Sequence, residues 1–541
     1  MHPNDASKLK VGLLLDSATV PAWQEALVRV LAHSRFAALH EVVLLRPPSE
    51  QTGGTDKTRR LPLLMRLYLK LDRLYFRSPG IPDACRPMDI RPLLESLSAV
   101  RIFEGKRQPD RDPDSPDLFI RLGGEAPIME NLPLGIWACR FGVSSSDPKE
   151  AIGVREVVER NPVTSVRLNV RLNGRDIALS ESHIMTDKRS IYRNRNNLYW
   201  KSVHFILGNV ERLASAGPDE VFAESALEPS PSNAGSDAPF TGWRTAGFLM
   251  RHFASFVRDR LARLFFIDQW IVLVAENRLA QDMEHYREIA PPKNKAWADP
   301  FMVRRDGRHF LFVEELPDPN GKGHVSVIRT DGESFSEPAP ILNLPVHLSY
   351  PFVFEYEGRH YMIPETRLNR TVALYECIEF PDKWVHKTNL MEHVDAVDTT
   401  LFYHGNVWWL FTSLLHDRDR LYASDLYYDR LFLFYSDSPF SDRWTPHPMN
   451  PVVEDVRSAR PAGRVYVRHG KIIRPSQDGS VRYGYGFRLN EIIRLTPTEY
   501  EERMFEIRRP DWDKSILATH TFNRDESFTV IDAMKRRRRW F

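Results

Sequence analysis

The stretch ADPFMVRRDGRHFLFVEE, residues 298–315, decides the fold because its pattern returns four more times along the chain. In each copy a small or polar start leads into a β-rich run, a turn and a second β-rich run. The other copies are SYPFVFEYEGRHYMIPET at 349–366, VDTTLFYHGNVWWLFTS at 397–413, ARPAGRVYVRHGKIIRPSQD at 459–478 and THTFNRDESFTVID at 519–532. The pattern predicts five repeated strand-turn-strand units.

The spacing of the copies identifies the architecture. Aligned residues of the five copies lie 51, 48, 62 and 60 positions apart, and these residues are Asp299, Tyr350, Asp398, Arg460 and His520. Such a period is typical of four-stranded propeller blades. Glycines separate the paired runs in four copies, as hairpin turns with positive φ require, at Gly307, Gly358, Gly405 and Gly470. We therefore predict an all-β, five-bladed β-propeller over residues 266–541.

A propeller brings the aligned residues together, because its innermost strands line one central axis. A second column ends the second runs and contains Glu314 or Glu315, Glu365, Ser413, Arg474 and Gln477. Carboxylates, arginines and a histidine are costly to bury without partners, so their convergence favours a functional funnel. Mutual ion pairing of these groups, without catalysis, is the alternative.

The rest of the chain predicts a second domain of a different class. Residues 10–16 form an apolar run followed by helical spacing over 21–32, and a second strand-helix pair covers 41–45 and 61–76. With a third strand at 117–122, this order indicates an α/β domain over residues 1–215. The first strand is followed by neither a GxGxxG motif nor a P-loop, so no nucleotide cradle is expected there. Residues 216–240, rich in Pro, Ser, Ala, Gly and acidic residues, are predicted to be a linker.

Composition excludes several classes of partner. The 541 residues carry a formal net charge of only +2, so no global field favours nucleic acid. Three scattered cysteines form neither a disulfide framework nor a zinc motif, and we expect a reducing, cytoplasmic environment. No metal site is predicted, although a funnel of carboxylates leaves a divalent cation open.

Two basic segments have two interpretations each. Residues 241–265 predict an amphipathic helix with interleaved arginines and aromatics, and residues 535–541 read KRRRRWF. Either segment is suited to peripheral contact with an anionic membrane. In that case the protein would lie at the inner face of the membrane. Alternatively, the helix packs its apolar face on a domain and the tail is solvated.

The propeller repeats resemble two known groups: the five-bladed glycosidases of the arabinanase and β-xylosidase type, and the N-terminal region of plant glucosamine inositolphosphorylceramide transferases. The glycosidase resemblance implies that Asp299 in ADPF is a general base and that Asp398 in VDTT is the carboxylate that tunes and positions the acid. His520 matches a late histidine of the same funnel. The glutamate that would act as general acid is missing, since the corresponding segment is Ser458-Ala459-Arg460-Pro461.

The missing acid favours transfer over hydrolysis. A glycoside needs a proton on its leaving oxygen, whereas a sugar nucleotide or sugar phosphate needs neutralisation of charge. We therefore expect a glycosyltransferase of glycan, polysaccharide or glycolipid biosynthesis, with no cofactor beyond such a donor. Glu365 is a second candidate base or sugar ligand, and the expected substrate-binding residues are Arg460, Arg464, Arg474, His520, Tyr350 and Glu315. Two alternatives remain: a glycosidase that uses an unrecognised acid such as Glu365, and a non-catalytic carbohydrate-binding propeller.

The N-terminal domain resembles formyltransferases through KVGLLLDSATVPAW (10–23), DLFIRLGG (117–124), LGIWACRFG (134–142) and NPVTSVRLNVRLNGRDIALSE (161–181). The resemblance implies a doubly wound sheet. The family's catalytic asparagine and histidine are absent from the matching stretch 135–141, GIWACRF, so no proton-shuttling imidazole stands there. We expect a degenerate scaffold that binds an acceptor, a donor or a partner.

Overall fold

The computed structural model forms two compact units that divide within one helix, between Phe253 and Ala254. Each unit is described by itself. The structure describes residues 8–45, 61–78, 80–97, 100–104, 115–123, 132–142, 151–223, 240–317, 321–415 and 429–539.

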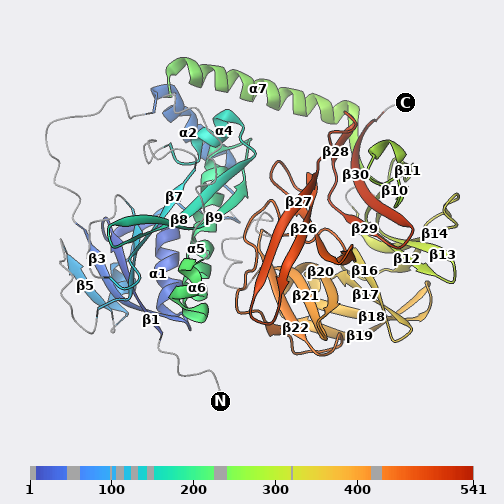
Figure 1. Cartoon of the computed structure of the whole chain (residues 1–541). Coiled ribbons are helices and arrows are strands. Elements are labelled where there is room, and N and C mark those ends of the chain that lie inside the picture. The colour runs from blue at the N-terminus through green and yellow to red at the C-terminus, as the bar shows by residue number, and fades with distance from the viewer. Residues whose placement is uncertain are drawn as a thin grey trace. The chain divides into compact units, whose positions relative to one another are not determined.

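The N-terminal unit is built on a seven-stranded sheet with the order β5-β3-β1-β6-β7-β8-β9 (Figure 1). Its first five strands are parallel, and the last two are antiparallel additions. The strand order reverses at β1, as in doubly wound sheets. The strands are β5 (Arg101–Glu104), β3 (Ala37–Leu44), β1 (Leu9–Leu15), β6 (Leu118–Leu122), β7 (Ile136–Phe141), β8 (Val163–Leu172) and β9 (Arg175–Met185), while β2 (Thr19–Pro21) pairs with β4 (Pro87–Asp89).

Helix α5 (Ile191–Ala216) is the central helix of this unit and contacts α1 (Ala22–Ala32), α2 (Leu63–Phe76), β8 and β9. The hydroxyl of Ser190 caps it by accepting from the N–H of Arg193. The unit also contains α3 (Arg91–Glu95), α4 (Val154–Glu159) and α6 (Pro218–Ala223). Part of the predicted linker is therefore helical, because α6 packs on α5; residues 224–239 lie outside the described part.

The C-terminal unit is a five-bladed propeller, and its first four blades are consecutive antiparallel sheets of four strands each (Figure 1). Blade 1 contains β12 (Ala296–Arg305), β13 (Arg308–Leu316), β14 (His324–Thr330) and β15 (Ala339–Leu342). Blade 2 contains β16 (Ser349–Tyr356), β17 (Arg359–Glu365), β18 (Thr371–Glu379) and β19 (Lys383–Glu392). Blade 3 contains β20 (Asp395–His404), β21 (Val407–Leu415), β22 (Leu431–Ser436) and β23 (Thr445–Pro446), and blade 4 contains β24 (Tyr466–Arg468), β25 (Lys471–Asp478), β26 (Gly486–Leu495) and β27 (Tyr500–Arg508).

Blade 5 closes the ring with strands from both ends of the propeller sequence. Strand β10 (Phe266–Glu276) pairs along its whole length with β30 (Phe528–Arg538). β11 (Arg287–Ile289) lies outside β10, while β28 (Ile516–Ala518) and β29 (Phe522–Arg524) pair with the other edge of β30. The prediction of a multidomain chain, α/β in its N-terminal part and a five-bladed propeller in its C-terminal part, is confirmed.

The inner hairpins form as the glycines predict. In blade 1 the turn residues Asp306 and Gly307 have φ of 50° and 74°, and in blade 2 Glu357 and Gly358 have 49° and 73°. Two consecutive positive φ values are typical of type I′ turns, whose twist matches that of paired strands. The turns fix the register of each innermost strand, and with it the residues that face the axis.

The two basic segments adopt different structures. Residues 241–265 form α7 (Gly242–Phe265), close to the predicted bounds. Lys535, Arg536 and Arg537 instead belong to β30 and pair with Glu288 and Asp268 of the same blade. Three of the five cations in the described part of this C-terminal segment are thus paired within a strand, and residues 540–541 lie outside the described part. No helix among those described has the length and apolar character needed to cross a bilayer.

Candidate functional site

A backbone irregularity recurs where three inner strands begin. Asp299, Tyr350 and Asp398 all have a left-handed backbone, with φ of 49°, 45° and 53°. The ladder of each strand shifts register at this point, by a bulge next to the residue. Left-handed conformations of non-glycine residues are strained and concentrate at functional sites. At Asp299, Tyr350 and Asp398 the backbone therefore departs from the regular β geometry of the strand around it.

Asp299 is buried and held by hydrogen bonds from two other blades. Its Oδ2 accepts from the N–H of Tyr350 at 3.2 Å, and its Oδ1 accepts from the hydroxyl of Thr521 at 2.6 Å. His520 lies beside it, with Nε2 3.6 Å from Oδ1 of Asp299. The carboxylate therefore has a fixed orientation toward an imidazole.

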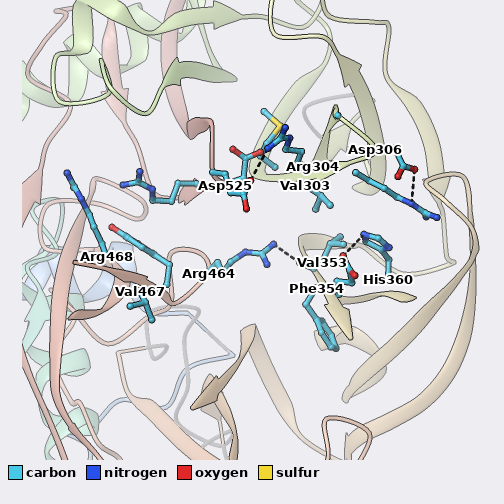
Figure 2. A pocket seen from close by; sticks show the side chains of 17 residues that line it. Val303, Arg304, Asp306, Val353, Phe354, His360, Arg464, Val467, Arg468 and Asp525 are labelled. Carbon is cyan, nitrogen blue, oxygen red and sulfur yellow. Dashed lines mark hydrogen bonds and ion pairs between the residues drawn. The ribbon is translucent and has the colours of Figure 1, made fainter. Parts of the chain in front are cut away.

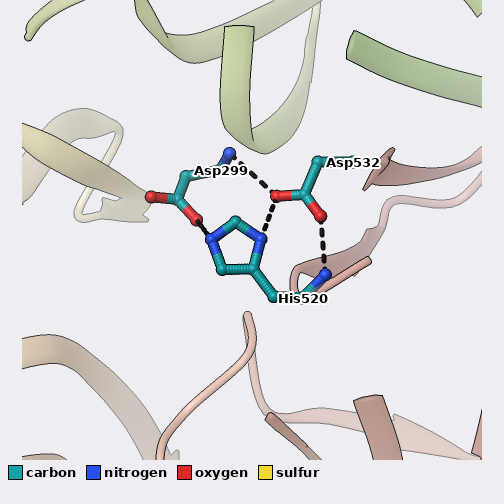
Figure 3. A group of neighbouring side chains, drawn as sticks. All are labelled: Asp299, His520 and Asp532. Carbon is teal, nitrogen blue, oxygen red and sulfur yellow. Dashed lines mark hydrogen bonds and ion pairs between the residues drawn. The ribbon is translucent and has the colours of Figure 1, made fainter. Parts of the chain in front are cut away.

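A third residue, Asp532, completes this arrangement (Figure 3). Its Oδ2 lies 2.6 Å from Nδ1 of His520, and its Oδ1 accepts the backbone N–H groups of His520 and Thr521 at 2.8 and 3.0 Å. The ring of Trp270 stacks on His520 at a centroid distance of 4.4 Å. Figure 3 shows the imidazole between the two carboxylates, so both of its nitrogens face an acceptor.

The charges of this group are shifted from their ordinary behaviour. The pKa of Asp299 is raised to about 7, mainly by burial. The charge of His520 lowers this pKa, whereas the charges of Glu314 and Asp398 raise it. Burial alone would lower the pKa of His520, but the carboxylates of Asp532 and Asp299 outweigh it and raise that pKa to about 9. Near neutral pH, His520 is therefore an imidazolium, while Asp299 is close to the midpoint of its titration.

A second cluster surrounds Asp398. Oδ2 of Asp398 accepts from Nε of Arg460 at 2.5 Å and from the amide of Gln477 at 3.0 Å. Nη2 of Arg460 also lies 4.0 Å from Oε2 of Glu365, an oxygen that makes no hydrogen bond to the described residues. Burial and the neighbouring Asp398 raise the pKa of Glu365 well above its ordinary value. Asp398 is thus the hydrogen-bonded partner of Arg460, and Glu365 beside them is a buried carboxyl with a raised pKa.

Aromatic residues border both clusters. The guanidinium of Arg460 lies 5.0 Å from the ring centroid of Tyr483, and that ring meets His520 edge-on at 5.7 Å. Tyr483 is 52% exposed, so it presents an aromatic surface to solvent. Tyr350 is buried and its hydroxyl pairs with Thr400 at 2.9 Å, which places it under the site as a support.

The structure separates the two neighbouring glutamates of blade 1. Glu314 pairs with His347 at 3.2 Å, and its charge acts on Asp299. Glu315 points to the other face, where its carboxylate accepts from Lys295 at 2.8 Å and Ser326 at 2.7 Å. Although burial opposes ionisation, hydrogen bonds from His324, Lys295 and Ser326 lower the pKa of Glu315 to about 2. Glu314 therefore faces the Asp299 cluster, and Glu315 has structural partners.

Arg464 lies in a different place from Arg460. It lines a cavity of about 740 Å³ at the far ends of the inner strands, and Asp299, Asp398 and His520 are not among the residues lining it (Figure 2). Its Nη2 donates to the carbonyl of Val353 at 2.6 Å.

Arg474 is also outside the two clusters. It is fully buried inside blade 4, where its guanidinium binds both carboxylate oxygens of Glu502, at 2.7 and 2.6 Å. The hydroxyl of Tyr500 donates to the same carboxylate at 2.6 Å. This bidentate pair joins β25 to β27, so it stabilises the blade.

One group of described residues has metal-ligating atoms close together: those of Asp299, His520 and Asp532 lie within 4.8 Å of one another. A metal needs the unprotonated imidazole. Nδ1 of His520 faces Asp532 and Nε2 faces Asp299, so the three residues form a hydrogen-bonded relay. A divalent cation held by the same three residues would displace the proton of that imidazole.

Sequence reasoning missed three members of the site. Asp532 ends the fifth repeat and belongs to neither aligned column, but an acidic residue at the end of an apolar strand is a signal that could have found it. Tyr483 and Trp270 lie outside the repeats, on the β25–β26 connection and on β10. The alignment of blades could not place them, because neither belongs to an inner strand.

Comparisons with known proteins place the propeller among relatives. Residues 285–526 match the family described as "Glucosamine inositolphosphorylceramide transferase 1, N-terminal". Glucosamine inositolphosphorylceramide transferase 1 of Oryza sativa subsp. japonica is 33% identical over 211 residues, which are 38% of this chain and 27% of the relative. The protein of the same name from Arabidopsis thaliana is 32% identical over 209 residues, 38% of this chain and 26% of the relative.

Solved structures with a similar arrangement are distant. An exo-1,5-alpha-L-arabinanase from a bovine ruminal metagenomic library is 14% identical, with a TM-score of 0.31, over 45% of this chain and 95% of that chain. A GH43_1 enzyme from Xanthomonas citri is 11% identical, with a TM-score of 0.31, over 45% of this chain and 87% of that chain. For the N-terminal unit, the resemblance to formyltransferases stays a prediction. The similarity of the propeller to the N-terminal region of glucosamine inositolphosphorylceramide transferases is confirmed over residues 285–526, and the chain matches 27% of the rice relative's length.

Proposed function

We propose that the propeller axis is the active site of a glycosyltransferase that uses a donor with a phosphate leaving group. The observation that carries the proposal is the buried carboxylate of Asp299, whose pKa of about 7 suits a general base at neutral pH. Two hydrogen bonds orient it, and the imidazolium of His520 compensates its charge when it is ionised.

The reaction assigns one task to each cluster. Asp299 takes the proton of an acceptor hydroxyl while the acceptor oxygen bonds to the anomeric carbon of the donor. The bond from that carbon to the phosphate oxygen breaks, and the phosphate leaves with the electron pair. Arg460, held by Asp398, is the cation that neutralises the leaving phosphate, so no proton donor is needed there.

The names of the relatives support this class of reaction. They are transferases, and the name specifies glucosamine and an inositolphosphorylceramide. A sugar donor and a glycolipid acceptor are accordingly the first substrates to try. Tyr483, half exposed beside Arg460, offers an aromatic face against which a sugar ring can pack.

A donor screen tests the proposal. The purified chain is incubated with sugar nucleotides, sugar phosphates and aryl glycosides, with binding followed by thermal shift and products by mass spectrometry. We expect stabilisation by a phosphate-bearing donor that is lost in Arg460→Met, and unchanged in Arg464→Met, because Arg464 lines another cavity. Equal loss in both variants would contradict the role of Arg460.

A second candidate function, hydrolysis, is favoured by one observation. Glu365 has a strongly raised pKa and an oxygen without a hydrogen bond to the described residues, which are properties of a general acid. With Asp299 activating a water, the two carboxyls would make an acid-base pair of the glycosidase type.

The variant Glu365→Gln separates the two functions. In a hydrolase, loss of the acid slows cleavage of a poor alkoxide leaving group far more than cleavage of an activated aryl glycoside. In the proposed transferase, turnover of a phosphate donor needs no acid and is expected to change little. Two results together would show that the protein is a hydrolase and not a transferase. The unchanged protein would release free sugar from an aryl glycoside, and a better leaving group would restore cleavage by Glu365→Gln.

A further inference from the structure

Helix α2 and the first half of α7, which both belong to the N-terminal unit, form a platform with an apolar outer surface. Helix α2 lies beside the first half of α7 (Figure 1). Tyr68 of α2 joins them, because its hydroxyl lies 3.3 Å from Nε2 of His252 and its ring packs edge-on against Phe248 at 5.6 Å. The buried faces of both helices are thereby occupied, and their other faces point outward.

Most exposed residues of α2 are apolar. Its buried side consists of Met65 and Asp72, and the carboxylate of Asp72 accepts from Ser190 and from the N–H of Tyr192. The exposed side chains, at helical spacing, are Leu63 (79%), Leu64 (43%), Leu67 (54%), Leu71 (56%), Leu74 (77%) and Tyr75 (71%). Single exposed leucines are common on protein surfaces, but a whole helix face of them marks an interaction site.

Helix α7 presents a matching stripe. Trp243 and Met250 are seven residues apart and 89% and 69% exposed, and Phe253 beside them is 69% exposed. The seven-residue period continues at Val257 and Leu264, which are 38% and 61% exposed. The stripe runs opposite Thr245 and Phe248, which are buried, so it is the free face of the helix.

Cations border the apolar face. In α2 and the residue after it, Arg66, Lys70 and Arg77 are exposed, as is Arg73, which pairs with Asp83. The helix's one acidic residue, Asp72, is buried. In α7, Arg244 and Arg251 lie on one side of the stripe by helical position, and Arg260 lies on the other. Apolar residues at the centre with arginine and lysine at the edges match the depth profile of an anionic bilayer, whose acyl chains lie below charged headgroups.

We propose that the α2–α7 platform, residues 63–77 and 243–253, binds the surface of an anionic membrane. The apolar side chains insert to the level of the acyl chains, and the lysine and arginine stems extend to the headgroups. Charge complementarity selects this occupant: a protein partner would need a correspondingly acidic surface around an apolar centre, whereas any anionic bilayer supplies both. The inference does not rest on the proposed catalytic function.

Vesicle flotation of the full chain tests the platform. Vesicles of phosphatidylcholine alone are compared with an equimolar mixture of phosphatidylcholine and phosphatidylglycerol. We expect binding to the anionic vesicles, reduced at least tenfold in Leu71→Glu/Met250→Glu. The matched control is Leu368→Glu/Ile378→Glu in the propeller, at side chains 65% and 62% exposed, which is expected to bind as the unchanged protein does.

A second pair of variants removes charge without touching the apolar face. Each cation near an anionic surface contributes about 1 kcal/mol, so Arg66→Gln/Arg251→Gln should weaken anionic-vesicle binding roughly thirtyfold. The same change at the exposed Arg482 and Arg503 of the propeller should have little effect. Near-ultraviolet circular dichroism checks that every variant remains folded.

Two outcomes would overturn the proposal. One is equal flotation of the platform variants and their controls, or no flotation of the unchanged protein. The other is self-association of the unchanged protein, seen by light scattering and lost in Leu71→Glu/Met250→Glu without any vesicle binding, which would assign the face to a second copy of the chain.

Discussion

Two residues of the first aligned column, Asp299 and Asp398, have both a strained backbone and an ionisable side chain. Asp299 and Asp398 hold left-handed backbones that an L-residue adopts at a cost of about 1 kcal/mol or more, and each places a carboxylate toward arginine or histidine. A purely structural bulge is satisfied by glycine or asparagine. The presence of acidic side chains at Asp299 and Asp398 favours a role for their charge.

The pKa values of the relay predict a bell-shaped dependence of turnover on pH. Asp299 acts as a base only when ionised, so the rate rises as pH rises through about 7. His520 compensates that charge only while protonated, so the rate falls as pH rises through about 9. Turnover measured from acid to alkaline pH checks both limbs.

The variant His520→Gln sharpens this test. The charge of His520 lowers the pKa of Asp299, so its removal should move the acid limb to higher pH and abolish the alkaline limb. The exposed His404 is the control, and His404→Gln should leave the profile unchanged. An unaltered profile in His520→Gln would contradict the relay.

At the residue scale, the repeat predicted which residues of the first aligned column lie close together. The other expected ligands Glu315, Arg464 and Arg474 lie elsewhere in the propeller. Aligned positions before a bulge face one axis, which is why Asp299, Asp398, Arg460 and His520 meet. Alternation along a strand reverses the face at every residue. Glu315 was the expected substrate ligand, but in the structure it contacts Lys295 and Ser326, and Glu314 acts on Asp299. The partners of Arg474 are also invisible in the repeat, because they come from β27 of the same blade.

At the element scale, turn chemistry explains why the hairpins were predictable. Gly307 and Gly358 have φ of 74° and 73° with open space around the Cβ position, so backbone conformation and not crowding selects glycine there. The strand-helix order of the N-terminal unit was equally readable, because buried parallel strands form continuous apolar runs. Helix α6 was missed, since its six residues lie inside a segment whose composition is that of a linker.

The buried pair of Arg474 and Glu502 gives a prediction at this scale. Arg474→Met leaves a buried carboxylate without its cation, so we expect a loss of about 3–5 kcal/mol in the free energy of unfolding. The exposed pair of Arg494 and Glu501 in the same sheet is the control, and Arg494→Met should cost about 1 kcal/mol or less. Urea unfolding of both variants measures the difference; equal, small losses would return Arg474 to the list of possible substrate ligands.

At the scale of the whole molecule, two segments that are distant in sequence close the propeller ring, and we expect this closure to stabilise it. β10 and β30 come from opposite ends of the propeller sequence and pair over eleven residues each. The fifth repeat, residues 519–532, covers only part of this blade, because β10 and β11 precede the first repeat in the sequence. A composite blade has no single sequence pattern, and only the closed structure shows it.

Ile531 tests this closure. It is buried in the β30 core and pairs with Leu273 of β10, so Ile531→Ala should cost about 2–5 kcal/mol. Ile493 of blade 4 is 43% exposed, and Ile493→Ala should cost about 1 kcal/mol or less. Denaturant unfolding followed by tryptophan fluorescence compares them, and similar losses would mean that blade 5 contributes no more than a surface strand.

The most direct test of the central claim is the turnover of Asp299→Asn on the donor identified by the screen, compared with Asp306→Asn. Asparagine has nearly the same shape as aspartate and tolerates a left-handed backbone, and the exposed Asp306 has φ of 50° in the same hairpin, so both variants should fold. We expect a loss of about a hundredfold to ten-thousandfold in turnover for Asp299→Asn alone, with donor binding retained. Full turnover in Asp299→Asn would show that the axis carboxylate is not the base and that the site binds carbohydrate without this chemistry.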